Sequence, residues 1–399
     1  MATLTPEGGK HPVTWYRSTT FAAFMVAATA FTCPDIFGAL NGMGAGGGAS
    51  PGVTNAANAI VFGVLAVFSL VAGVICNRIT PKWTLLIGTL GYAPYAAGFY
   101  VVDRYKQDWL LLFGSVGSGA VFLGYPEENR KGFATSLKLM LQNLGASISG
   151  IITLALNVNR NYRGSISNST YVVLMTNICL GVPFALALPP THRVQRTDGR
   201  KVILKNNLSL SRELQILWRI TKQPAIVAIV PLMIYAQWFL SYQWQFNYAY
   251  FTVRSRALNS MLFYISGFIS SKIRARVGFL IGAILVGASW ILGQAVQVHY
   301  SKTQPTLDWA ERKFGLGCFV FILWGVSDPL VTSYKYWLAG TLTNNVNEAT
   351  YLAALINALG SVGSTFGFVI TKMNFTLVGA CAINLALFYI SVPGLAWVA

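Results

Sequence analysis

Long apolar runs, one after another along almost the whole chain, constrain its fold more than any other feature of the sequence. Ten of them meet or approach the length of about 20 residues that an α-helix needs to cross a bilayer. They cover residues 18–40, 54–76, 83–102, 133–157, 168–188, 223–248, 276–298, 315–337, 349–371 and 375–396. We therefore expect an all-α, polytopic membrane protein whose main partner is the lipid bilayer.

Two further apolar runs, 109–125 and 257–271, are shorter. They would be spans four and eight of a twelve-span protein. Runs of this length are marginal for crossing unless the bilayer thins or the flanking side chains reach the interface. Twelve spans with two short members is our main expectation, and ten spans stays open as the alternative.

Composition excludes a soluble protein of ordinary kind. The 399 residues are 54% hydrophobic and 10% charged, whereas globular domains carry roughly 25% charged residues. The net charge of +17 would suit a nucleic-acid partner. The Lys and Arg side chains lie between apolar runs, however, and form no separate basic module, so we expect no nucleic-acid binding.

The basic residues instead predict an orientation. With twelve spans and the N-terminus inside, nineteen of the 29 Lys and Arg residues fall in inside segments and ten in outside segments. Cytoplasmic loops carry such an excess, so we expect both ends of the chain in the cytosol. The glycosylation sequons at Asn168 and Asn374 then fall outside. The sequence does not say which membrane holds the protein.

The longest polar connection, residues 189–222, divides the chain into an N-terminal helical bundle, 1–188, and a C-terminal helical bundle, 223–399. Within this basic linker, Leu210, Leu214 and Leu217 recur at helical spacing. We expect an amphipathic helix over 208–221 that lies on the inner membrane surface. A solvated linker with a short helical turn is the alternative.

Two acidic residues lie well inside apolar sequence, where a charge is costly and usually functional. Asp35 follows Pro34 in span one, and Asp328 precedes Pro329 in span ten. Proline in a membrane helix frees backbone carbonyls. We expect each carboxylate either to take up a proton or face a cation pathway, or simply to cap a break in its helix.

Amide and indole side chains inside the spans are candidates for lining a solute cavity. They are Gln237, Gln243 and Trp244 in span seven, Asn58 in span two and Asn143 in span five. Such groups hydrogen-bond a neighbouring helix more often than a solute.

Other motifs carry little chemistry. The glycine-rich stretch after Gly42 has no Lys-Ser/Thr and no phosphate-binding context, so we expect a flexible external loop. We find no Cys pair with metal spacing and no catalytic set, so neither an enzyme, a metal site nor a cofactor is expected.

A faint internal repeat supports two six-span halves. Gly73, Asn77, Arg78 and Lys82 follow the second span, and similar residues follow the eighth, from Gly267 to Arg276. Parallel repeats of this kind occur in one large transporter class. The first copy resembles a degenerate form of the gating-loop signature between spans two and three of the major facilitator superfamily.

Other stretches are more specific. The Asn41-Gly42 segment after Cys33-Pro34-Asp35, the Tyr125-Pro126-Glu127-Glu128 stretch and Tyr334-Lys335-Tyr336-Trp337 resemble the Unc ninety-three-like family, also called ion channel regulatory proteins, in its fungal branch. The match runs through nearly the whole chain. The resemblance implies a major facilitator-type fold, with two six-helix bundles around a central cavity.

We therefore expect secondary transport of an unidentified small solute by alternating access. Asp328, with Asp35, would sense the proton or coupling cation. The resemblance also implies an alternative, since named family members regulate potassium channels or escort receptors. In that case the chain would be a non-transporting partner of another membrane protein.

Overall fold

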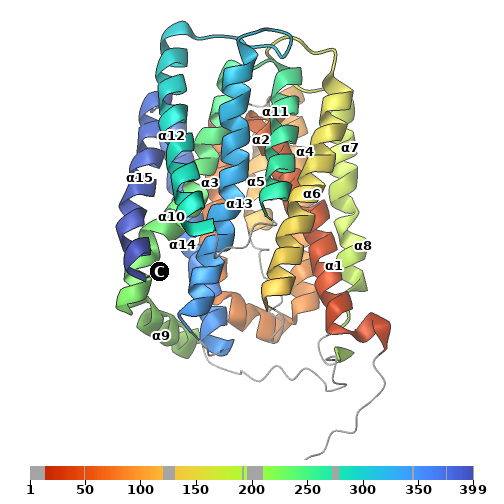
Figure 1. Cartoon of the computed structure of the whole chain (residues 1–399). Helices are drawn as coiled ribbons and strands as arrows, with labels where there is room; N and C mark the ends of the chain where they lie inside the picture. Colours follow the sequence, from red (N-terminus) through yellow and green to blue (C-terminus); the bar gives the residue numbers. More distant parts are fainter. Residues whose placement is uncertain are drawn as a thin grey trace, which may run out of the picture.

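The computed structural model describes residues 14–48, 50–119, 131–190, 193–195, 210–271, 278–343, 346–373 and 375–398. Within these ranges the side chains of residues 35, 72–74, 76–78, 131–139, 278–281, 346, 347 and 350 are not described. The described chain is helical throughout and forms a bundle of long, nearly parallel rods (Figure 1).

The first half of the chain contributes eight α-helices and two short 3-10 turns, and the second half, with the segment that precedes it, contributes seven α-helices. Their bounds are η1 (Trp15–Arg17), α1 (Thr19–Thr32), α2 (Pro34–Gly42), η2 (Ala45–Gly47), α3 (Pro51–Ile79), α4 (Pro81–Tyr105), α5 (Trp109–Gly119), α6 (Lys131–Asn157), α7 (Asn168–Cys179), α8 (Gly181–Ala187), α9 (Leu210–Thr221), α10 (Pro224–Tyr250), α11 (Val253–Ser270), α12 (Gly278–Thr303), α13 (Phe314–Thr341), α14 (Val346–Lys372) and α15 (Leu377–Val398).

The lengths of these helices match a bilayer. In the described chain, eight segments are long and apolar enough to cross a membrane: α1 with α2, α3, α4, α7 with α8, α10, α13, α14 and α15. In α4, exposed Trp83 and Tyr105 lie 22 residues apart, which is about 33 Å of helix. Aromatic side chains at that spacing suit the two interfaces of a hydrocarbon layer about 30 Å thick.

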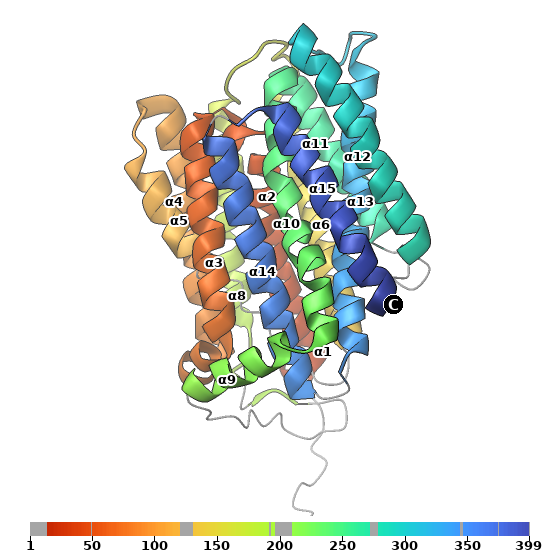
Figure 2. The same cartoon turned by 90° about the vertical axis from the view of Figure 1, so that its left-hand side faces the viewer.

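Two pairs of helices join the halves along their length. α3 of the first half packs against α14 of the second, and α6 packs against α11. Within the second half, α10 is enclosed by α14 and α15. Figure 2 shows α3, α14 and α10 side by side, with α9 lying across one end of the bundle. We call that end the lower end; the opposite upper end carries residues 158–167 and 304–313 (Figure 1).

Glycines let some of these helices approach closely. A methyl group on Gly98 of α4 would lie 2.4 Å from the Leu111 Cα of α5, and one on Gly114 would lie 2.4 Å from the Tyr95 nitrogen. No side chain fits at such separations, so the α4–α5 pair depends on small residues at its contact, as is common between membrane helices.

Several sequence-based boundaries need correction. The gating-loop candidates are helical: α3 continues to Ile79 and α4 starts at Pro81, so Thr80 alone separates them. Span eight is longer than its apolar run, because α11 begins at Val253 and includes Arg254 and Arg256. The apolar run began too late because it excluded Arg254 and Arg256, whereas both cations make polar contacts at the upper end and do not stop the helix.

Other expectations are confirmed. Span one breaks at its proline, with α1 ending at Thr32 and α2 starting at Pro34. The segment 210–221 is an amphipathic helix, α9. The fourth apolar run forms α5 as far as Gly119, and its remainder lies outside the described residues.

Candidate functional site

A carboxylate–amide pair in the interior of the second half is the strongest candidate for chemistry. Gln243 of α10 donates a hydrogen bond from Nε2 to Oδ1 of Asp328 in α13, at 3.2 Å. Gln243 is fully buried. Its Oε1 and the Asp328 Oδ2 are both buried without a hydrogen-bond partner. Two acceptor oxygens therefore stand unsatisfied inside a membrane helix bundle, where an unpaired polar group is expensive.

The proline beside Asp328 adds a third acceptor. Pro329, inside the continuous helix α13, has no N–H, so the carbonyl of Gly325 loses its helical donor. That carbonyl points toward α11: a methyl group on Gly267 would lie 3.2 Å from the Gly325 oxygen and 3.1 Å from Asn143 Oδ1 of α6. The structure thus brings Asn143, from the first half, close to the turn of α13 that precedes Pro329. The surroundings are rich in acceptors, which suits a bound proton, cation or donor-bearing solute.

Trp244, next to Gln243, belongs to an aromatic cluster between the halves. Its ring lies 6.1 Å from Phe37 of α2 and 5.6 Å from Phe368 of α14, between ring centroids. Phe368 in turn stacks on Phe62 of α3 at 5.7 Å. These four buried rings join both halves, so Trp244 packs between the halves in this conformation.

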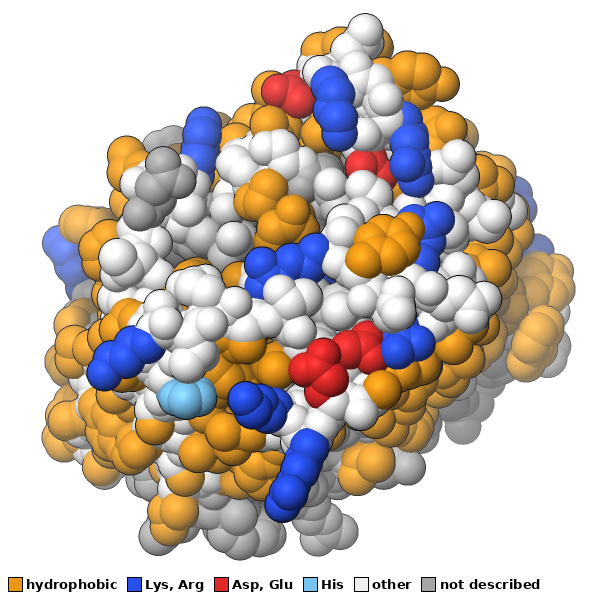
Figure 3. Space-filling model, turned by 90° about the horizontal axis from the view of Figure 1, so that it is seen from above, with side chains coloured by type: hydrophobic (Ala, Val, Ile, Leu, Met, Phe, Trp, Pro, Cys, Tyr) orange, Lys and Arg blue, Asp and Glu red, His pale blue; other side chains and the backbone are white. Residues whose placement is uncertain are grey.

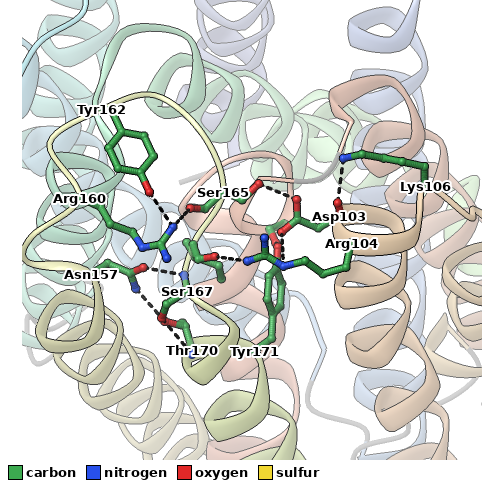
Figure 4. Close-up of polar contacts among 12 residues, drawn as sticks. Asp103, Arg104, Lys106, Asn157, Arg160, Tyr162, Ser165, Ser167, Thr170 and Tyr171 are labelled. Carbon is green, nitrogen blue, oxygen red and sulfur yellow. Dashed lines mark hydrogen bonds and ion pairs between the residues drawn. The ribbon is translucent and has the colours of Figure 1, made fainter.

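A strap formed by residues 158–167 closes the upper end. It is held to the first half through polar contacts seen in Figure 4: Arg104 Nη2 donates to the Ile166 carbonyl at 2.9 Å, and Ser165 Oγ donates to Asp103 Oδ1. Asn157 fixes its far end by accepting from the Ser167 N–H at 2.8 Å.

The same strap also binds the second half. Arg163 Nη2 donates to the carbonyls of Ala249 and Pro305, each at 2.7 Å. The Val253 N–H donates to the Tyr162 carbonyl at 2.9 Å. Buried Arg256 donates to the carbonyl of Gly164. Figure 3 shows this face from above, with Lys and Arg side chains scattered among apolar and uncharged groups.

The glycine-rich stretch is a tightly packed part of this closure, so the expectation of a flexible external loop is wrong. Residues 45–47 are buried. Gly46 has φ +57, and a methyl group there would lie 2.1 Å from the Phe99 ring. Its carbonyl accepts from Tyr171 OH, and that of Gly47 accepts from the Ile166 N–H. The absence of a Cβ permits both the backbone angles and the close approach. From the sequence alone, the same glycines indicate flexibility.

A second polar group at the upper end holds α11 to the 304–313 loop. Arg254 donates to both carboxylate oxygens of Asp308, at 2.9 and 2.6 Å. Thr252 Oγ1 donates to the same carboxylate at 2.7 Å. The hydrogen bonds from Arg254, with smaller help from Thr252 and the Ala310 N–H, lower the pKa of Asp308 from 3.8 to about 2.

The remaining predicted cavity residues lie elsewhere. Asn58 belongs to a closed hydrogen-bond ring: it donates to Asn41 Oδ1 at 2.9 Å and accepts from Tyr95 OH. Asn41 also donates to Tyr95 OH at 3.3 Å. This ring ties α2, α3 and α4 together. Gln237 faces α14, where a methyl group on Gly360 would lie 3.0 Å from its Cδ. Neither residue joins the Gln243–Asp328 pair.

Several predicted residues cannot be placed in full. Asp35 is the second residue of α2, but its side chain lies outside those described. The same holds for Gly73, Asn77 and Arg78 within α3, whereas Lys82 is half-buried at the start of α4. Asn168 is exposed and begins α7 at the upper end. Asn374 lies outside the described residues.

Sequence reasoning missed the buried cation of α13. Lys335 is 2% exposed. Its ammonium lies 5.2 Å from the centroid of the Tyr336 ring. Lys335 follows Asp328 by seven residues, which is two helical turns and the same face. Its position inside the apolar run 315–337 was the available signal.

A scan against models of known protein families finds no match, but comparison with curated proteins does. Notoamide biosynthesis cluster protein O' of Aspergillus versicolor is 30% identical over 94% of this chain and 87% of its own length. An UNC93-like protein of Schizosaccharomyces pombe is 27% identical over 92% and 80%, and UNC93-like protein 1 of Arabidopsis thaliana is 28% identical over 91% and 86%.

The chain belongs to the UNC93-like family.

Solved structures show what fold this UNC93-like chain has. A D-xylose–proton symporter superposes with a TM-score of 0.63 at 12% identity, covering 94% of this chain and 96% of the symporter. A POT family transporter in complex with 5-aminolevulinic acid gives 0.63 at 12%, covering 95% and 97%. A major facilitator superfamily transporter, FucP, gives 0.54 at 14%, covering 96% and 99%. The expected major facilitator-type fold, with two six-helix bundles, is therefore confirmed.

In this UNC93-like protein the Gln243–Asp328 pair lies between α10 and α13 of the second half, within a multi-pass membrane protein that has a transporter fold. The pair offers two unpartnered acceptor oxygens, and the Gln243 amide has a second N–H besides the one that donates to Asp328. What it can do chemically is hold a proton, or a positively charged or donor-bearing group.

Proposed function

We propose that this chain is a secondary transporter of a small solute and that the Gln243–Asp328 pair is its coupling site. The two halves, 1–188 and 223–399, would rock about this pair in alternating access. The observation that carries the proposal is the pair of buried, unpartnered oxygens, Gln243 Oε1 and Asp328 Oδ2. The identity of the solute remains to be found by assay.

Energetics favour coupling through Asp328. An ionised carboxylate without a counter-charge is costly in the membrane interior. Asp328 is therefore stable there when it holds a proton or faces a cation, and the amide of Gln243 stabilises either form through its hydrogen bond. Binding or release of the positive charge would change the relative free energies of the conformations in which the two halves meet at this pair. Such a change is what couples ion binding to a conformational change. Asp35 in α2 would be the first-half counterpart.

The contacts at the upper end support a state closed on that side. The strap 158–167 binds both halves, and the cluster around Trp244 joins them with apolar surface. Access to Asp328 in this state would be from the lower end. Opening the upper end would require release of the Arg163 and Arg256 hydrogen bonds.

The proposed orientation puts the lower end in the cytosol. Helix α1 begins and α15 ends there, and α9 lies across it (Figures 1 and 2). The basic 189–222 segment connects at the same end, and cytoplasmic loops are the ones enriched in Lys and Arg. Both chain ends would then be cytosolic and the strap extracytoplasmic.

Reconstitution tests coupling directly. Purified protein in proteoliposomes with an imposed proton gradient is assayed with a panel of radiolabelled small solutes, including sugars, nucleosides and amino acids. We expect one class to accumulate with the gradient. Asp328→Asn, which keeps the size of the side chain, should abolish accumulation but retain exchange of solute at equal concentrations. Unchanged gradient-driven accumulation in Asp328→Asn would show that the coupling role is wrong.

A regulatory role is the second candidate. It is favoured by predicted cavity residues whose side chains hydrogen-bond to other side chains of the protein. Asn58, in its closed ring of hydrogen bonds with Asn41 and Tyr95, is one of them. Capture of the tagged chain in mild detergent separates the two functions. A stoichiometric channel or receptor, with no flux of any solute in the panel, would favour regulation.

A further inference from the structure

Helix α9 has two apolar surfaces, and one of them faces away from the protein. Glu213, Leu217 and Ile220 are buried against the bundle. Leu210, Leu214 and Trp218 are exposed by 43%, 42% and 63%. The exposed three recur every four residues, so they form one continuous stripe along the helix.

The stripe is the apolar wall of a shallow groove. Ser211 and Gln215 line the polar side of this groove, and Leu210, Leu214 and Trp218 line its apolar side; the groove is open over most of its extent. Two walls of different polarity, running parallel along one helix, match a ligand that has an apolar chain and a polar head.

A cation stands at the end of the groove. The Lys222 ammonium lies 4.8 Å from the centroid of the Trp218 ring, which holds the positive charge at the apolar wall. Arg219, one turn earlier, is 72% exposed and only weakly engaged, 3.8 Å from Glu348 of α14. An exposed ion pair at that distance contributes little, so Arg219 adds to the positive potential beside Lys222.

The position of α9 decides between possible occupants. It lies across the lower end of the bundle, roughly at right angles to the spanning helices (Figure 2). Exposed Trp15 and Trp83 also lie at this end, at the start of η1 and of α4. Tryptophan at such a level marks the boundary between headgroups and acyl chains. Lipid is therefore the material that meets the stripe.

We propose that α9 is a binding site for an anionic phospholipid. An acyl chain lies along Leu210, Leu214 and Trp218, and the phosphate headgroup is held by Lys222 with Arg219 beside it. The affinity of a basic amphipathic helix for a leaflet increases both with the apolar area that it buries and with its electrostatic attraction to anionic lipids. This site is independent of the proposed transport at Asp328.

Native mass spectrometry of the purified full chain in detergent tests the site, with phosphatidylserine and phosphatidylcholine as probes. We expect the wild type to retain phosphatidylserine preferentially. Lys222→Gln should reduce that preference about fivefold, the effect of one basic residue near an anionic surface. Lys313→Gln, which removes an exposed cation at the upper end, is the matched control and should leave the preference unchanged.

A second variant separates the lipid from other occupants. Leu214→Ser with Trp218→Ser should lower retention of both lipids, because it removes the apolar wall without altering charge. If Lys222→Gln retains lipid as the wild type does, the proposal fails. It also fails if the double variant retains lipid unchanged but converts a dimer to a monomer, since a second copy of the chain would then cover the stripe.

Discussion

At the scale of single residues, polar side chains in this protein divide by whether their hydrogen bonds are complete. Asn41, Asn58 and Tyr95 satisfy one another and hold three helices together. Gln243 and Asp328 share one hydrogen bond and each keep an unpartnered oxygen. Completed networks stabilise a fold, whereas an incomplete buried pair requires another reason to exist.

The Arg254–Asp308 ion pair makes a prediction about pH. Folding lowers the Asp308 pKa to about 2 from 3.8, so the pair stabilises the folded protein above about pH 4 and loses that contribution as the pH falls from about 4 to 2. Asp308→Asn lacks this dependence. The difference in melting temperature between wild type and Asp308→Asn, measured in detergent, should be constant from pH 5 to 8 and shrink below pH 4.

A matched substitution checks that prediction. Asp108→Asn removes a carboxylate from another connection at the upper end, where Asp108 is exposed. At pH 7 it should lower the melting temperature less than Asp308→Asn does, because Asn substitutes well for Asp at the position that precedes the first turn of a helix. A difference for Asp308→Asn that persists unchanged to pH 2 would contradict the role assigned to this ion pair.

Residue types and positions allowed only part of this site to be predicted. Asp328 stood out because a lone carboxylate inside an apolar run has a clear energetic cost. Gln243 was also a cavity candidate, but nothing in the sequence separated it from Gln237, about two turns earlier. Which amide meets Asp328 depends on helix rotation, and the apolar sequence of α10 has almost no amphipathic asymmetry from which to read it.

At the scale of elements, helix contacts here depend on glycine as much as on large apolar side chains. Lipid is as apolar as leucine, so helices in a bilayer associate through close packing. Gly363 of α14 shows the consequence: a methyl group there would lie 2.2 Å from the carbonyl oxygen of Ile234 in α10. Both partners are backbone, so neither can move without displacing its helix.

We therefore predict that Gly363→Ala destabilises the protein by about 1–3 kcal/mol, the usual cost of overpacking. Gly340→Ala is the control, since a methyl group on Gly340 of α13 meets nothing within 4 Å; it should be neutral or slightly stabilising. Thermal unfolding in detergent, followed by intrinsic fluorescence, measures both. Equal melting temperatures for the two variants would show that α10 and α14 are not held at this separation.

The helices themselves were largely predictable, because runs of about 20 apolar residues have few other solutions in a membrane protein. Their ends were less so. Arg254 and Arg256 lie inside α11, although charged residues normally mark the end of a span, because Asp308 pairs with Arg254 and the Gly164 carbonyl accepts from Arg256 at the upper end. Partners supplied by distant segments are invisible to a reading of hydropathy.

At the scale of the whole molecule, polar contacts at the upper end hold the two halves together, and α9 lies across the lower end (Figure 2). Strap 158–167 makes hydrogen bonds to both halves: to Asp103 and Arg104 of the first half, and to Arg256 and the Ala249 and Pro305 carbonyls of the second. Its hydrogen bonds should therefore set how often the upper end opens.

Loosening the strap should expose the centre from the upper side. We predict that Arg163→Ala, which removes the bonds to the Ala249 and Pro305 carbonyls, speeds labelling of a Gln243→Cys probe about fivefold or more, since each bond contributes about 1 kcal/mol. An impermeant maleimide is added to right-side-out proteoliposomes, in a background without Cys76 and Cys179.

Arg312→Ala serves as the control for the strap, because Arg312 is an exposed cation on the same face. It should leave the labelling rate as it is. Equal rates for Arg163→Ala and Arg312→Ala would mean that the strap does not limit access.

Orientation can be tested on the same molecule in cells. Asn168 is exposed where α7 begins at the upper end, so we predict that it is glycosylated and that Asn168→Gln abolishes the mobility shift produced by a glycosidase. Thr176→Ala, on the same helix but away from the sequon, is the control. A glycan-free Asn168 beside a modified sequon engineered into α9 would reverse the proposed topology.

The glycine turn at residues 44–48 also bears on how the upper end separates. A methyl group on Gly44 would lie 2.7 Å from the Trp244 carbonyl oxygen of α10, and the nearby Gly42 carbonyl accepts from Asn247 Nδ2 of α10 at 2.8 Å. Parting the halves there uncovers backbone groups that no side chain covers, and water must replace the Asn247 donor in the same event. Opening is therefore a wetting transition, with a barrier set by how readily a few water molecules enter a dry seam.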